Sequence, residues 1–284
     1  MSQGEPDASW STQQLLDLAI ARATDAGADD TDAYREPIRF LHRREPKEVF
    51  ALVAPLATDA DTRLRSLVPE VLRFLGGRPQ PLLTETVALF RQMLATEKSA
   101  DVIASIGAAF VDLRDAAGAE LMEPYAAHAD HGVREVVVHA LLTRPDEASI
   151  ALWIKMTSDT SPEVRNAATF ALGSQIEADS EAIRDALVRR LSDPADEVRA
   201  EAILGLALRG DGRALAKLKA GLASDDLWPH YVDAAFHLAS PDLCDVLHEL
   251  EDTADEETLA FLAMNAKHSL RDAIVACDDA AARS

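Results

Sequence analysis

A motif that recurs about every 33 residues is the feature of this sequence that most restricts its fold. The two clearest copies run from Asp159 to Gly173 and from Asp193 to Ala207, and their arginines lie 34 residues apart. Weaker copies occur at residues 32–41, 61–72, 101–110, 130–141 and 229–238. A unit of this length buries its apolar face only against neighbouring copies, so the chain is predicted to form a stack of repeats.

Each copy predicts an α-helix that begins at a capping residue. In the copy at 159–173, Ser161 suits the N-cap, Pro162 the first helical position, and Glu163 the positive end of the helix dipole. Apolar residues then recur at helical spacing, and a second amphipathic segment follows, as at 181–191 and 213–222. The sequence is rich in Ala and Leu, and aromatic residues make up only 5% of it. This composition favours closely packed helices.

The pattern Asp-x-x-x-x-Val-Arg-x-x-Ala-x-x-Ala-Leu-Gly resembles the HEAT repeat, in particular the short bacterial repeats of the phycobilisome-lyase type. The resemblance is strongest at 159–173 and 193–207 and extends over roughly residues 30–250. It implies an all-α fold, a right-handed α-solenoid of about seven short helix pairs with the Val-Arg helices on the concave side. It implies no reaction, because the segment from Val164 to Gly173, followed by Ile183 to Leu187, is similar to a set of bacterial HEAT-repeat proteins with no assigned activity. Tetratricopeptide and ankyrin repeats have a similar period, but their W-x-x-L-G-x-x-Y and T-P-L-H patterns are absent.

The limits of the repeats give the expected domain organisation. Residues 1–12 are predicted to form a flexible N-terminal arm, 13–270 a single HEAT-like solenoid and 271–284 a C-terminal tail. Within the solenoid, the acidic segment 256–270 is expected to be a closing helix pair or a cap.

One arginine recurs at the same position in most copies. We expect these arginines to pair with the turn aspartate of their own or a neighbouring unit, and ligand contact is the alternative. The five are Arg35, Arg65, Arg134, Arg165 and Arg199.

An apolar stripe is predicted on the concave side. If Val164, Ala168 and Ala171 face the core, the positions one and four or five residues after each arginine face the groove. From residue 138 onward, the stripe consists of Val138, His139, Asn166, Thr169, Phe170, Ile203, Leu204, Val232 and Phe236. An exposed apolar stripe with aromatic anchors indicates a protein or peptide partner. Alternatively, tight curvature of the array buries these side chains between neighbouring repeats.

The net charge of −21 disfavours nucleic acid and anionic membranes as partners. Residues 240–284 hold 11 acidic residues against three basic ones, with the densest run at 251–257. This acidity either steers a basic protein partner or serves solubility or a salty cytoplasm.

Cysteine usage and hydropathy give the expected compartment. The two cysteines, Cys244 and Cys277, are far apart and lack CxxC spacing, so a disulfide is not expected and a reducing compartment fits. The first 11 residues have no features of a signal peptide, and no apolar run reaches about 18 residues. A soluble, cytoplasmic monomer is expected.

The sequence contains none of the common catalytic or nucleotide-binding motifs. HEAT-like di-iron hydroxylases need several His-Glu dipeptides, and this chain has one, at His248. No metal, cofactor or catalytic residue is therefore predicted. The expected function is a non-catalytic interaction scaffold that binds a protein or peptide in its concave groove, with a basic partner as one candidate. The alternative is a HEAT-like enzyme, of lyase or DNA glycosylase type, with an unrecognised site.

Overall fold

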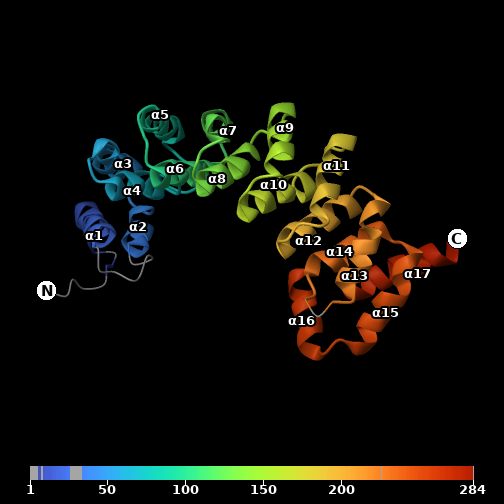
Figure 1. Ribbon diagram of the computed structural model, residues 1–284. Coiled ribbons are helices and arrows are strands. Elements are labelled where there is room, and N and C mark those ends of the chain that lie inside the picture. Colours follow the sequence, from blue (N-terminus) through green and yellow to red (C-terminus); the bar gives the residue numbers. More distant parts are fainter. Residues whose placement is uncertain (1–5, 8, 26–33, 225, 284) are drawn as a thin grey trace. The chain divides into compact units, whose positions relative to one another are not determined.

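The computed structural model describes residues 6–7, 9–25, 34–224 and 226–283, and every regular element in these ranges is a helix (Figure 1). The predicted all-α repeat fold is confirmed. The chain divides into two compact units, residues 1–144 and 145–284, where the sequence predicted a single solenoid over 13–270.

The first unit is a double layer of helices. Helices α4, α6 and α8 pack side by side in one layer, and α3, α5 and α7 form the second layer along it (Figure 1). The elements are α1 (Thr12–Thr24), α2 (Arg35–Leu41), α3 (Pro46–Val53), η1 (Ala54–Thr58), α4 (Thr62–Leu72), α5 (Leu83–Leu94), α6 (Ala100–Leu113), α7 (Ala116–Met122), η2 (Glu123–Tyr125) and α8 (His131–Leu141).

The second unit, taken by itself, has the same two-layer scheme. Helices α10, α12, α14 and α17 pack in succession, and α9, α11, α13 and α15 cover them. The elements are α9 (Glu147–Met156), α10 (Pro162–Ser174), α11 (Glu181–Arg190), α12 (Asp196–Ala207), η3 (Gly212–Ala214), α13 (Leu215–Leu222), α14 (Pro229–Leu238), η4 (Pro241–Leu243), α15 (Cys244–Thr253), α16 (Glu256–Asn265) and α17 (Leu270–Arg283). Helix α16 is an addition to this scheme, since it lies between α15 and α17 in sequence and packs mainly against α14.

The predicted side-chain caps form at some helix starts, namely at Ser161 of α10, Asp61 of α4 and Asp130 of α8, whereas in the described ranges α2, α6, α12 and α14 begin without one. Ser161 accepts a hydrogen bond from the backbone N–H of Val164 at 3.4 Å, with Pro162 in the first turn. The copies at 61–72, 101–110, 130–141 and 229–238 become α4, α6, α8 and α14. In the earliest copy, residues 32–33 lie outside the described ranges, and α2 begins at Arg35.

Helices α10 and α12 approach to backbone contact. A Cβ atom added to Gly205 would lie 2.6 Å from the Cα of Gly173, the equivalent residue one repeat earlier. The repeated glycine therefore sets the spacing of these two helices, because any side chain at this crossing would push them apart.

The predicted termini differ from the structure. Residues 1–5 and 8 of the predicted arm lie outside the described ranges, while Ser11 caps α1, which begins at Thr12. The prediction of a C-terminal tail at 271–284 is wrong, because these residues belong to α17. This helix takes the place next to α14 in its layer, and its Ala273, Ile274 and Cys277 are buried.

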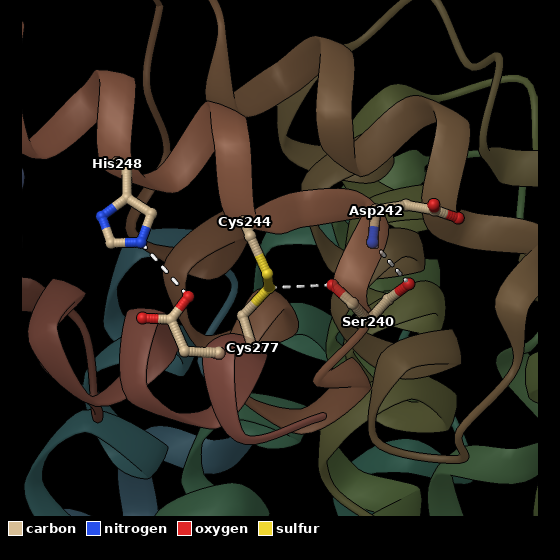
Figure 2. The surroundings of a disulfide bond; sticks show 6 residues. Ser240, Asp242, Cys244, His248 and Cys277 are labelled. Carbon is tan, nitrogen blue, oxygen red and sulfur yellow. Dashed lines mark hydrogen bonds and ion pairs between the residues drawn. A yellow bond between two sulfur atoms is a disulfide. The ribbon is translucent and has the colours of Figure 1, made fainter. Parts of the chain in front are cut away.

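The expectation of unpaired cysteines is also wrong. Cys244, the first residue of α15, and Cys277 of α17 form a disulfide with their Cα atoms 5.6 Å apart (Figure 2). The two residues are 33 positions apart in sequence, and only the packing of α17 against α15 brings them together. A C-terminal tail, as predicted for residues 271–284, would make no such contact with α15.

Candidate partner-binding surface

Four of the repeat arginines make the same contact with the backbone. In each, one terminal guanidinium nitrogen donates hydrogen bonds to the carbonyls six and five residues earlier, at 2.7 to 3.2 Å. These arginines are Arg65, Arg134, Arg165 and Arg199. Each guanidinium therefore satisfies carbonyls in the turn that precedes its own helix.

Two of these arginines also bind an acidic residue of the next repeat. Arg165 donates to both carboxylate oxygens of Asp193 at 2.8 Å, and Arg65 binds Glu97 in the same bidentate way at 2.7 and 3.0 Å. Burial opposes ionisation of Asp193, but hydrogen bonds from Arg165 and the Ala195 N–H, with the nearby arginine charges, outweigh it and lower its pKa. The guanidinium groups of Arg65 and Arg165 are thus engaged within the array.

The other three repeat arginines are Arg35, Arg134 and Arg199. Arg199 forms an ion pair with Asp196 of its own helix. Arg35 is exposed at the start of α2.

The predicted concave stripe is not a continuous exposed surface. Five of its nine residues are buried, namely Val138, Thr169, Ile203, Leu204 and Val232. The other four are partly exposed: His139, Asn166, Phe170 and Phe236. The interpretation of an open apolar groove is wrong for the buried five, because neighbouring helices of the repeat layer cover these positions.

Phe236, one of the predicted aromatic anchors, packs against other residues of the second unit. Its ring stacks on His268 with 3.9 Å between centroids, and His237 contacts both rings edge-on. Asp233 holds His268 in place by accepting from its backbone N–H at 2.8 Å and lying 3.0 Å from its Nδ1. Phe236 therefore packs against the loop between α16 and α17.

Large apolar side chains are exposed instead on α16. Phe261 is 46% and Met264 is 83% exposed, and Ala260 and Glu257 are exposed beside them. These four residues, at the spacing i, i+3, i+4 and i+7, form one face of the helix, here called the α16 stripe. The sequence did not reveal this face, because Leu259 and Leu262 make the other sides of α16 equally apolar.

The α16 stripe borders a hollow of about 600 Å³ within the second unit. Its walls come from the start of α12, the segment before α14, and the first turns of α16. The lining residues are Asp196, Asp226, Leu227, Trp228, Asp255, Glu257, Thr258 and Phe261. We call this hollow the Trp228 cavity. Two smaller hollows adjoin it, one sharing Asp226 and Trp228 and the other sharing Leu227 and Thr258.

The ionisable groups of the cavity are acidic. The lining contains four carboxylates and no lysine or arginine. Asp196 is paired with Arg199, whereas Asp226 and Glu257 form no ion pair within the described part of the chain. Hydrogen bonds from the Thr258 backbone N–H and hydroxyl lower the pKa of Asp255, so this carboxylate is charged at neutral pH. The cavity thus combines aromatic surface with two carboxylates outside any described ion pair, while Arg199 and Lys217 line the adjoining hollow that shares Asp226 and Trp228.

Neither a metal cluster nor a membrane helix is found in the described ranges. No three His, Cys, Asp or Glu side chains there are grouped to hold a metal ion. None of the helices there has the length and apolar character needed to cross a bilayer.

Comparisons with known proteins agree on the fold. Residues 150–232 match the sequence model of the family described as HEAT repeats. Protein YibA from Escherichia coli K12 is 33% identical over 133 residues, which are 47% of this chain and 47% of YibA. The matching region of the chain thus spans about half the length of the curated relatives it matches, which include YibA of E. coli O157:H7.

Solved structures extend the likeness over nearly the whole chain. An X-ray structure of E. coli YibA aligns with 97% of this chain and 99% of its own at a TM-score of 0.71 and 22% identity. An engineered protein aligns at 0.51 and 18%, covering 95% of this chain and 77% of its own. A chain of the CpcE–CpcF phycocyanin lyase complex from Nostoc sp. PCC7120 aligns at a TM-score of 0.46 and 16% identity, covering 99% of this chain and 97% of its own. The predicted resemblance to bacterial HEAT-like repeat proteins is confirmed.

Proposed function

We propose that this chain is a non-catalytic protein-interaction module that binds a basic protein partner through the α16 stripe. The proposal is carried by the exposure of Phe261 and Met264, at 46% and 83%, one turn apart on the same helix. Apolar surface of this kind is unfavourable in water, and its burial by a partner is a source of binding free energy.

The position of α16 supports a docking role. Among its residues only Leu262 is buried, so α16 contributes little to the core of the second unit. An exposed helix face with apolar residues three and four positions apart, as Phe261 and Ala260 are from Met264, packs well against a helix or an extended apolar segment. HEAT-like arrays in general present such surfaces to other proteins.

Charge supports a basic partner. The second unit carries 27 acidic residues against 13 basic ones, and Asp255, Glu256 and Glu257 begin α16 beside the stripe. A basic surface would be attracted to this region and oriented toward the apolar stripe, whereas an acidic one would be repelled.

The test is site-specific photo-cross-linking followed by affinity measurement. A photoreactive amino acid replaces Met264 in the full chain, which is expressed in cells that naturally produce this protein. A second sample carries the photoreactive amino acid at Arg189, an exposed position on α11. A basic protein should be captured at position 264 and not at 189. With purified components, Phe261→Asp should raise the Kd at least about tenfold, because a charge would enter the apolar contact.

Leu208→Asp is the matched control. Leu208 is 41% exposed at the end of α12, so the same chemical change is made away from the stripe. Its Kd should remain near that of the wild type. The proposal is contradicted if Phe261→Asp leaves the Kd unchanged or if both variants weaken binding equally. Circular dichroism and thermal unfolding verify that each variant is folded.

A further inference from the structure

We propose that the Trp228 cavity receives a lysine or arginine side chain of the partner. This inference rests on the proposed function and assigns the basic group of the partner to a defined place. The cavity is lined by Trp228 and Phe261, and it carries Asp226, Asp255 and Glu257 without a lysine or arginine among its lining residues.

The aromatic residues suit the two parts of such a side chain. Trp228 is partly exposed and Phe261 is 46% exposed, so both offer ring surface to a ligand. The aliphatic stem of lysine or arginine packs favourably on aromatic surface, and its cationic end is attracted to the ring face, most strongly to that of tryptophan. A neutral polar side chain would gain neither interaction in full.

The carboxylates supply the charge complement. Asp226 and Glu257 have no ion pair within the described ranges, so neither must break one to bind an incoming cation. Asp196 is already paired with Arg199, and the side chain of Asp255 accepts a hydrogen bond from the Thr258 N–H at 2.8 Å. Asp226 and Glu257 are therefore the two carboxylates expected to contact the cation.

The cavity is continuous with the docking face. Glu257 and Phe261 belong both to the α16 stripe and to the cavity lining. A segment lying along the stripe would thus pass the cavity mouth, where a basic side chain could enter. The volume of about 600 Å³ is within the usual range of ligand pockets, and it admits a short stretch of chain beside that side chain.

The first test uses peptide probes and the full chain. A soluble peptide of alternating lysine and serine is compared by calorimetry with the same peptide acetylated on every lysine, which keeps the stem and removes the charge. The lysine peptide should bind at least about tenfold more tightly. An arginine–serine peptide and its citrulline counterpart form a second pair that distinguishes a preference for guanidinium from one for ammonium. Equal binding of charged and neutral peptides would overturn the proposal.

Fluorescence locates the binding site. Of the three tryptophans, Trp153 is fully buried and Trp228 lines the cavity. The lysine peptide should change the emission of the wild type but not that of Trp228→Phe. The same change in both proteins would place the peptide elsewhere and refute the assignment.

Charge-neutralising variants separate the cavity from the general acidity of the chain. Asp226→Asn with Glu257→Gln should raise the Kd of the lysine peptide about tenfold. The matched control, Glu177→Gln with Asp279→Asn, removes two exposed carboxylates of the same unit that do not line the cavity. An equal rise in both double variants would attribute binding to net charge and overturn the proposal.

The outcomes also separate this inference from the proposed function. If the partner cross-links at position 264 but the cavity variant binds it like the control variant, the cavity assignment fails and the docking face stands. If the lysine peptide binds in the cavity and no protein is captured at position 264, the docking proposal fails and the cation site remains.

Discussion

Arg165 and Asp193 form a buried ion pair that joins two successive repeats. Both guanidinium–carboxylate hydrogen bonds measure 2.8 Å, and the two residues are only 9% and 4% exposed. Asp193→Asn would leave the Arg165 charge buried without its counterion. We expect this variant to lower the free energy of unfolding by about 2–4 kcal/mol, measured by urea denaturation.

Asp185→Asn is the control for this prediction. Asp185 pairs with Arg213 at the same distance, 2.8 Å, but both side chains are nearly half exposed. Solvent screens such a pair, so its loss should cost less than about 1 kcal/mol. Equal losses in the two variants would contradict the role assigned to burial.

Glu97 gives the first unit a defined response to acid. Hydrogen bonds from Arg65 lower the pKa of Glu97 to about 2 against the opposing effect of burial, and the N–H groups of Ser99 and Lys98 lower it further. The folded pKa lies below the ordinary value of 4.5, so this contribution to stability is fully present above that pH. It is then lost as the pH falls toward about 2.

The corresponding measurement compares the wild type with Glu97→Gln. Urea denaturation should show the wild type more stable near neutral pH, with the difference shrinking below about pH 4.5. A difference that stays constant between about pH 7 and pH 3 would show that this ionisation is not linked to folding.

At the level of elements, the disulfide fastens α17 to α15 around the lightly packed α16. The polar contacts between α15 and α17 are exposed, as between His248 and Asp278 at 3.2 Å (Figure 2). A cross-link between residues 33 positions apart is worth about 3–4 kcal/mol through the entropy of the unfolded chain. Reduction should therefore destabilise the second unit and speed amide hydrogen exchange in α16 and α17. In Cys244→Ala with Cys277→Ala, the reductant should change nothing. A wild type indifferent to reduction would contradict this role.

The sequence predicts which helices form better than it predicts which of their faces are covered. Caps and helical periodicity are local, so α10 and α12 appear where their repeats indicate. Coverage depends on neighbours: α10, α11 and α14 surround α12, which buries Ile203 and Leu204. Phe261 is as apolar as Ile203 and Leu204 but is exposed, because α16 lies outside the two layers. The arginine contacts follow from the repeat, whereas the α16 stripe depends on a helix that has no counterpart in the other repeats.

Because the whole chain is negatively charged, salt is expected to raise its thermal stability and to slow its association with a basic partner. The first unit holds 22 acidic residues against 15 basic ones, and the second holds 27 against 13. Salt screens the repulsion among these groups, so raising NaCl from about 0.05 to 0.5 M should increase the Tm. The same screening should slow association with a basic partner about tenfold or more, while the dissociation rate changes little. Stopped-flow mixing and thermal unfolding of the same samples measure both effects. If the acidity served solubility alone, the Tm would rise and the association rate would not respond to salt.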